Sequence, residues 1–395
     1  MRSLMLILTA AATIFLACSG SPSEPVEPQG STPPFEQYPM HGVVHWRDFF
    51  EWDEATTASA ARAGLLIFPL ERCFSPEAVD IIARLRELNP DIKILGYLGV
   101  LHVAELYPDT AYLERALPWT LDYYRLVEDH WAWTTTGDTF HVWPGHIALN
   151  PITESGEGNE QLLTGIIDLL EEYIGDWPDA VDGVLHDYFM YRPYISPYND
   201  NVTGELDLDG NGILIGDDEN ERAVFLRWQK DYAAAMRSRF GRGFIQIANG
   251  RVPQEDAELA GYLNGIFYEF FPNLAWGVTD RTGFEKLLEN QADGWLAEAH
   301  GRTWSILTNN SIEYNNMFCM LSSLLADCFY TELIDDYTFR GWSIDIDAGQ
   351  ALSGLMVEGK ADSILTYRRS FSEGEAMISF NPYGGRREWT FIENN

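Results

Sequence analysis

Short apolar runs alternate with longer amphipathic segments along most of the chain. Residues 77–88, EAVDIIARLREL, carry apolar side chains at helical spacing, and residues 160–173, 219–240 and 283–292 repeat that pattern. Such an alternation is typical of strand and helix units around a parallel sheet. The short runs predict eight strands, at residues 42–46, 64–69, 93–98, 183–187, 243–248, 265–269, 303–307 and 327–331.

Eight such units predict an α/β fold, a (β/α)8 TIM barrel over residues 41–345, with insertions at 101–150 and 195–218. An open doubly wound sheet is the alternative, but GVVHWRDFF stands where such a fold often has a glycine-rich phosphate loop. Residues 346–395 alternate with a period of two, which predicts a small C-terminal β element packed on the barrel.

The net charge of the chain excludes one class of partner, nucleic acid, and leaves the predicted fold unchanged. With 60 acidic and 26 basic residues its net charge is -34, which would repel nucleic acid over most of the surface. We expect no nucleic-acid partner, and the acidity itself is explained by solubility.

The N-terminus has the pattern of an export signal. Residues 1–17 join one basic residue to an apolar run too short for a transmembrane helix, and FLAC before Ser19 resembles a lipobox. We expect cleavage before Cys18, lipidation of its thiol and a Ser/Pro/Glu-rich tether over 18–40, so that the protein is exported and touches a membrane only through a lipid anchor. Secretory cleavage without a lipid is the alternative.

Three further cysteines remain, Cys73, Cys319 and Cys328. A Cys319–Cys328 disulfide and buried free thiols are both compatible with their number.

The first insertion is rich in aromatic residues, which either stack on sugar rings or pack the segment onto the barrel. They are Trp119, Tyr123, Tyr124, Trp131, Trp133 and Trp143.

The second insertion contains DLDGNGILIGDD, residues 207–218, which resembles an EF-hand loop. Asp207, Asp209, Asn211, Ile213 and Asp218 stand at ligand positions, Ile213 through its carbonyl group. The loop predicts a structural Ca²⁺ site, although Asp218 replaces the usual glutamate; an acidic turn without metal is the alternative.

Two predicted strands end in an acid. GVLHD ends the fourth strand at Asp187, and GIFYE ends the sixth at Glu269, so both carboxylates are expected at the barrel mouth, where one pair can flank a glycosidic bond. The phenylalanines around Glu269 favour its protonated form, which makes Glu269 the acid and Asp187 the nucleophile or base. His186 should face away from them. Caps and ion pairs are the structural alternatives.

Other polar or aromatic residues at the predicted strand ends are candidate substrate contacts: His45, Trp46, Asp48, Glu71, Arg72, Tyr97, Tyr188, Asn249 and Asn309.

The runs NPDIKILGYLGV, VWPGHIALNPIT, DGVLHDYF, FIQIANG, NGIFYEFF and YRRSFSEGEAMISFNP resemble bacterial barrels often labelled hypothetical glycosyl hydrolase, over most of residues 41–382. The resemblance implies a TIM barrel and, through a relation to α-galactosidase-like barrels, a nucleophile at Asp187 and an acid/base at Glu269. Asn150 and the 207–218 loop depart from the family's pattern.

The sequence therefore predicts an exported glycoside hydrolase that acts on an oligo- or polysaccharide without a catalytic cofactor. Retention is the expected outcome, and inversion is the alternative. A glycan-binding surface lipoprotein without catalysis is the alternative. A metal-dependent hydrolase is disfavoured, because His41 and His45 lack the HxH spacing that places two imidazoles on one strand face.

Overall fold

The computed structural model describes most of the chain from residue 37 onward. The described residues are 37–45, 52–105, 117–143, 145–187, 189, 206–249, 256–269, 271, 281–292, 294, 296, 298, 303–310, 313–333, 346–359, 363–383 and 386–394. The proposed signal, Cys18 and nearly all of the tether lie outside them. Among these residues, no helix is long and apolar enough to cross a membrane.

One parallel sheet of eight strands forms the centre of the molecule. Its order is β1 (Gly42–Val44), β2 (Leu65–Pro69), β3 (Lys93–Leu98), β7 (Gly183–His186), β8 (Ile245–Asn249), β9 (Gly265–Tyr268), β10 (Ile306–Asn310) and β11 (Phe329–Leu333). The first and last strands approach each other through a parallel bridge from His41 to Tyr330. The eight predicted strands and the TIM-barrel architecture are therefore confirmed.

The strand sequences explain why the sheet is covered on both faces. Their side chains are mainly Val, Ile, Leu and Phe, and nearly all of those in β2, β7 and β9 are fully buried. Strands covered on both faces read as continuous apolar runs, as these do.

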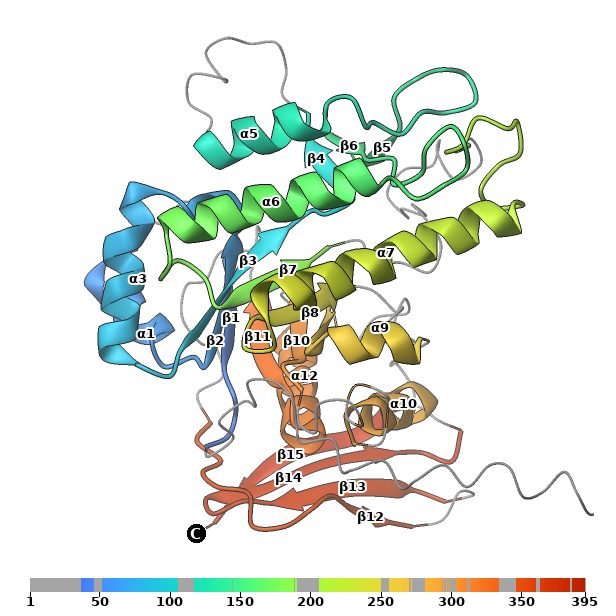
Figure 1. The fold of residues 1–395 in the computed structure, drawn as a ribbon. Helices are drawn as coiled ribbons and strands as arrows, with labels where there is room; N and C mark the ends of the chain where they lie inside the picture. The colour runs from blue at the N-terminus through green and yellow to red at the C-terminus, as the bar shows by residue number, and fades with distance from the viewer. Residues whose placement is uncertain are drawn as a thin grey trace, which may run out of the picture.

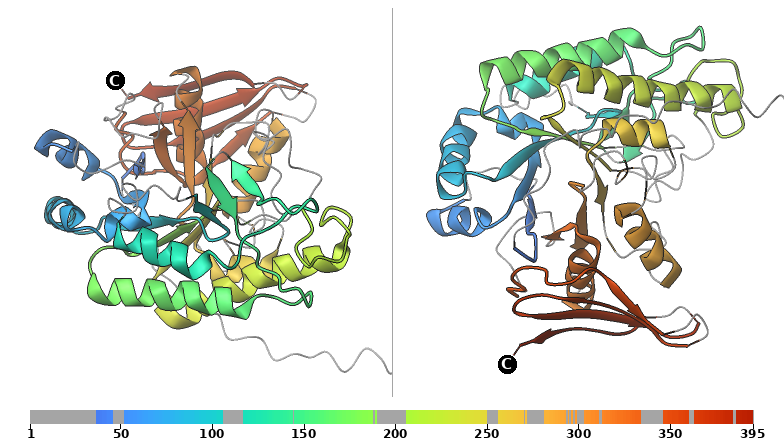
Figure 2. Two further views of the ribbon diagram at one scale, coloured as in Figure 1. Left: turned by 90° about the horizontal axis from the view of Figure 1, so that it is seen from above. Right: turned by 60° about the horizontal axis from the view of Figure 1, so that its bottom comes forward.

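Helices follow the strands and cover the outside of the sheet (Figure 1). Helices α5 (Pro118–Val127), α6 (Glu160–Asp176) and α7 (Glu219–Phe240) lie along one side, and α1 (Glu54–Ala60) and α3 (Pro76–Leu88) along another, as the views in Figure 2 agree. The remaining described helices are α2 (Leu70–Cys73), α9 (Ala257–Tyr262), α10 (Arg281–Ala292) and α12 (Glu313–Ala326).

The first insertion forms a small antiparallel sheet of its own. It contains β4 (His102–Ala104), β6 (His146–Ala148) and β5 (His141–Trp143), with β6 in the centre. The β4–β6 pairing sets Ala104 opposite His146 and His102 opposite Ala148.

The predicted C-terminal β element is an antiparallel sheet of four strands, β12 (Met356–Glu358), β13 (Leu365–Ser370), β14 (Gly374–Phe380) and β15 (Arg386–Glu393). It packs against α12 and α10, as Figure 1 shows. Trp389 contacts Phe318 edge to face, and Phe380 contacts Phe284, so the sheet buries aromatic side chains against the barrel helices.

The three described cysteines, Cys73, Cys319 and Cys328, are buried free thiols. Of the two alternatives that the sequence left open, the structure has the thiols and not the Cys319–Cys328 disulfide.

Candidate functional site

Four neighbouring strands each supply one polar side chain at the same end of the barrel. Tyr97 lies in β3, Asp187 follows β7, Asn249 ends β8 and Glu269 follows β9. The side-chain amide nitrogen of Asn249 donates to Oδ1 of Asp187 and to Oε2 of Glu269, each at 2.9 Å. Two bonds of that length from one nitrogen keep the two carboxylate oxygens within about 6 Å of each other.

Asp187 is buried, with 5% of its surface exposed, but it is well supplied with donors. Its Oδ2 atom accepts a hydrogen bond from the Tyr97 hydroxyl at 2.5 Å and lies 3.2 Å from Nε2 of His102. Together with Asn249, these groups contact both oxygens of the carboxylate. Donors of this kind stabilise the ionised form of Asp187.

A pair of histidines from the first insertion stands behind Asp187. Nδ1 of His102 lies 3.3 Å from Nδ1 of His146, and the two rings meet edge to face. Burial lowers the pKa of His146 to about 4, with the neighbouring His102 adding to the shift, so His146 is neutral at neutral pH. A neutral His146 that donates to His102 fixes the tautomer in which His102 donates to Asp187.

Sequence reasoning missed both histidines. Residues 102 and 146 are brought together only by the antiparallel pairing of β4 with β6, which no local spacing reveals. The one local sign is Gly99, because a Cβ atom there would stand 2.3 Å from the His102 ring. The carbonyl group of Gly99 also accepts a hydrogen bond from Tyr123 at 2.9 Å, which holds this turn in place.

His186 faces the opposite side of β7, as its alternation with Asp187 predicts. It is fully buried, its Nε2 lies 3.1 Å from Oε1 of Gln246, and its ring contacts Tyr232 of α7 edge to face. Burial lowers its pKa to about 3, so it is a neutral core residue.

The remaining predicted contacts have different outcomes. His45 is fully buried between the rings of Trp52 and Phe68, so its position is that of a core residue and not of an exposed sugar contact. Glu71 and Arg72 lie, half-buried, on α2 directly after β2. Outside the described residues lie Trp46, Asp48, Tyr188 and the side chain of Asn309.

The exposure of the two acids differs from the expectation. Phe267 and Phe271 are buried in the core, whereas Glu269 is half-buried and Asp187 is the more enclosed carboxylate. The apolar sequence around Glu269 therefore describes the strand that carries it and not its own environment.

The aromatic residues of the first insertion mainly pack. Trp119 and Tyr123 are buried and stacked on each other, and Trp119 also contacts Phe74 and Tyr173. Of the two alternatives that the sequence left open, packing onto the barrel holds for these two residues. Trp133, by contrast, is 48% exposed.

A second group of acids lies in the loop before α7 and in the first turn of that helix. Oxygens of Asp207, Asp209 and Glu221 lie within 4.8 Å of one another. Glu221 is 2% exposed, and burial raises its pKa to about 7, with the charges of Asp209 and Asp207 adding to the shift. Asp218 has a different position, because its Oδ1 accepts from the amides of Asn220 and Glu221 and caps α7.

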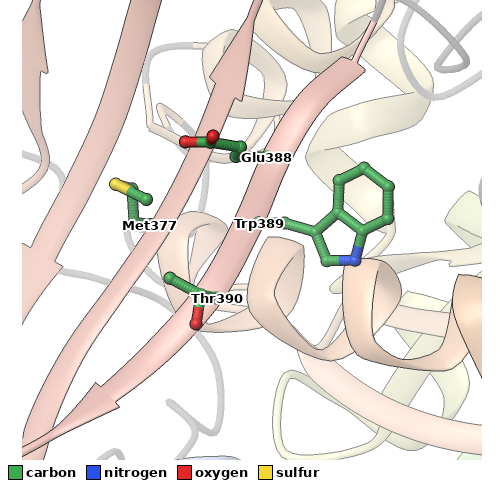
Figure 3. A pocket seen from close by; sticks show the side chains of 4 residues that line it. All are labelled: Met377, Glu388, Trp389 and Thr390. Carbon is green, nitrogen blue, oxygen red and sulfur yellow. The ribbon is translucent and has the colours of Figure 1, made fainter.

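The C-terminal sheet carries a hollow of about 410 Å³ lined by Met377, Glu388, Trp389 and Thr390 (Figure 3). Trp389 points toward the helix beneath the sheet, and the other three side chains lie on the opposite side of the strands. This hollow contains none of the residues around Asp187.

No protein-family model and no curated protein matches this chain. Solved structures with a similar fold include Eubacterium rectale Amy13B (9% identity, 90% of this chain and 88% of that chain, TM-score 0.47) and an alpha-amylase from H. orenii (9%, 87% and 90%, TM-score 0.46). Another is a cyclic alpha-maltosyl-(1→6)-maltose hydrolase from Arthrobacter globiformis (11%, 90% and 89%, TM-score 0.45). At these identities and TM-scores, the similarity does not indicate the activity of this chain.

Proposed function

We propose that this protein is a glycoside hydrolase in which Asp187 and Glu269 form the reacting pair of carboxyl groups. The observation that carries the proposal is the amide of Asn249, which contacts one oxygen of each acid at 2.9 Å. Glycosidases need two carboxyl groups on either side of one bond, at the end of the barrel where these strands finish.

The spacing supports hydrolysis with retention. The Asn249 bonds keep one oxygen of each acid within about 6 Å of the other, near the roughly 5 to 5.5 Å separation typical of retaining enzymes. Inverting enzymes hold the two carboxyl groups about 6.5 to 9.5 Å apart to leave room for a water molecule. A measurement of which anomer is released first tests this step, and initial release of the inverted anomer contradicts it.

Asp187 is the nucleophile in this proposal, because its donors keep it ionised. It attacks the anomeric carbon while Glu269 gives its proton to the glycosidic oxygen, which breaks the bond to the leaving sugar and leaves a glycosyl ester on Asp187. Glu269, now ionised, takes a proton from the water that attacks the same carbon. The sugar is released, and both carboxyl groups return to their starting forms.

Tyr97, His102 and His146 hold the nucleophile in position. Tyr97 and His102 contact the Oδ2 atom of Asp187, and Asn249 contacts Oδ1. A carboxylate fixed on both oxygens keeps the same approach to its substrate in each turnover.

The test is a release assay with aryl glycosides and with bacterial and algal polysaccharides, on the wild type and Glu269→Gln. The variant should lose hydrolysis while it keeps binding, because a glutamine amide fits the site but cannot protonate the leaving oxygen. Glu388→Gln, in the hollow of the C-terminal sheet, is the matched control and should leave turnover unchanged. Glycan binding by the wild type without turnover of any substrate would replace the hydrolase with the non-catalytic alternative.

We also propose that the protein is exported and anchored by a lipid on Cys18. The apolar run before FLAC and the Ser/Pro/Glu-rich stretch after it support this location. Labelling of growing cells with a radioactive fatty acid should mark the wild type but not Cys18→Ser, and equal labelling of both would rule out Cys18 as the modified residue.

A further inference from the structure

The loop from Leu206 to Asp218 is held in a fixed shape by buried anchors. Leu206, Leu208 and Ile215 are buried, and the amide of Ile215 donates to the carbonyl group of Leu206 at 2.9 Å. Gly212, the sixth residue counted from Asp207, has a φ of 84°, which suits the sharp turn found at this position in calcium loops.

The side chains of this loop turn inward. Asp207 accepts hydrogen bonds from the amides of Gly210 and Asn211 through Oδ1 and from Gly212 through Oδ2. Asp209 accepts from the amide of Asn211. These bonds fix the two carboxylates on the same side of the turn.

Glu221 completes the group from the first turn of α7. Its Oε1 atom accepts from the amides of Leu208, in a short contact, and of Asp209 at 3.1 Å. Its other oxygen, Oε2, is buried and has no hydrogen-bond partner among the residues that the structure describes. In its ionised form, a buried carboxylate oxygen without a donor beside two further carboxylates is strongly unfavourable, and a bound cation would offset this cost.

We propose that Asp207, Asp209 and Glu221 bind one Ca²⁺ ion. The ligand set differs from the one that the loop spacing predicts, because Asp218 caps α7 and the acid three residues later reaches back in its place. Asn211 directs its amide nitrogen to Asp209 and Asp218, and its oxygen accepts from the amide of Ile213. It therefore orders the loop.

The chemistry of the donors selects the ion. All three ligand groups are carboxylates, and hard oxygen donors suit Ca²⁺ and Mg²⁺ and not Zn²⁺, which prefers nitrogen and sulfur. Ca²⁺ accepts a larger and less regular set of oxygens than Mg²⁺, which requires a near-ideal octahedron and retains several waters. The ligand set here combines two carboxylates from a turn with one from a helix, which is an irregular arrangement that suits Ca²⁺ better than Mg²⁺.

A bound ion would join three parts of the molecule. The carbonyl group of Leu208 accepts a hydrogen bond from Asn150 at 2.8 Å, and Leu206 forms a bridge with Thr134. Both partners belong to the first insertion, which also carries His102 and His146. The ion would therefore connect α7, its preceding loop and the insertion, and its role is structural.

The test is calorimetric titration of the full chain, freed of metal with a chelator, with CaCl₂ and separately with MgCl₂. The wild type should bind one Ca²⁺ ion more tightly than Mg²⁺, and its thermal midpoint should rise with Ca²⁺. Absence of Ca²⁺ binding would overturn the site, and equal affinity for Mg²⁺ would overturn the choice of ion. The readouts are binding and thermal stability, so failure here is distinct from failure of the proposed hydrolase.

Substitutions distinguish Glu221, the proposed Ca²⁺ ligand, from Asp218, which caps α7. Glu221→Gln should weaken Ca²⁺ binding at least about tenfold, because it removes one of three charged ligands. Glu219→Gln, an exposed neighbour on the same helical turn, is the matched control and should bind as the wild type does. Asp218→Asn should keep the rise in thermal midpoint on adding Ca²⁺, and loss of this rise in Asp218→Asn but not in Glu221→Gln would restore Asp218 as the ligand. If Glu221→Gln does not fold, Asp207→Asn takes its place with the same expected loss.

Discussion

Asp187 at the barrel mouth and Glu221 at the start of α7 are both buried carboxylates, but their surroundings differ. Asp187 meets a phenol, an imidazole and an amide, and this amide of Asn249 bridges it to Glu269. Glu221 meets two backbone amides on one oxygen, none of the described donors on the other, and two further acids. Hydrogen-bond donors favour the ionised form of a carboxylate, as the proposed role of Asp187 requires, whereas a group of acids short of donors suits a cation. The kind of partner, and not burial alone, distinguishes the two sites.

The largest expected effect is that of Asp187→Asn. Asparagine keeps the shape of the side chain but cannot form the glycosyl ester, so kcat should fall roughly ten-thousand-fold while the thermal midpoint changes little. Steady-state kinetics and a melting curve check both parts. A variant with substantial turnover would show that Asp187 is held in position for some other reason.

A smaller loss is expected from Asn249→Ala, which removes the donor that the two acids share. Without it the carboxylates repel each other and move, and a misplacement of about 1 Å can cost on the order of a hundredfold. We expect kcat to fall by about that factor, with a smaller change in KM. An unchanged kcat would mean that the spacing of the acids does not depend on this amide.

Removal of Ca²⁺ should lower the thermal midpoint and leave kcat nearly unchanged, which is the reverse of the effect expected for Asp187→Asn. A chelator should lower the thermal midpoint by several degrees, because bound ligand stabilises only the folded state, yet change kcat at 25 °C less than about threefold. Parallel kinetics and melting curves in chelator and in excess CaCl₂ measure both quantities. A large loss of kcat would show that the two groups of acids act as one site.

The smallest expected effect concerns His186, on the other face of the strand that leads to Asp187. Its pKa in the folded chain is lowered to about 3 by burial, so as the pH falls below the ordinary value near 6.5 the unfolded chain takes up the proton first. Stability is therefore full above about pH 6.5 and decreases as the pH falls toward 3, by up to about 2 kcal/mol at pH 5 from this residue. His186→Gln should show a smaller difference in unfolding free energy between pH 7.5 and pH 5. An equal difference in both proteins would assign the acid sensitivity to other groups.

The fold could be predicted because its signal is local. Each barrel strand is an apolar run bounded by polar or glycine residues. GVLHD and GIFYE each end in an acid, so the position of that acid at the strand end follows from the strand sequence alone and does not depend on the conformation of the loops. The same reasoning placed Tyr97 and Asn249 at the ends of predicted strands, although it did not predict their hydrogen bonds to Asp187.

The missed residues depend on contacts between distant segments. His102 and His146 meet through a small sheet that the sequence did not indicate. Glu221 lies outside the twelve-residue calcium pattern and enters the group only because α7 begins with Asp218 as its cap. His45 directly follows β1, as a residue at the barrel mouth would, but Trp52 and Phe68 enclose its ring.

The seam between the first and last barrel strands sets the order in which the chain can fold. Tyr38, just before β1, bonds with Asp327 and with the backbone of Ala348 and Gly349, and Arg369 of the C-terminal sheet contacts both Asp327 and Tyr38. These partners follow Tyr38 in the sequence by 289 residues for Asp327 and by 331 residues for Arg369. A chain emerging from the ribosome must therefore keep its first strand unpaired on one side until nearly all of the protein has been made, so the barrel closes late.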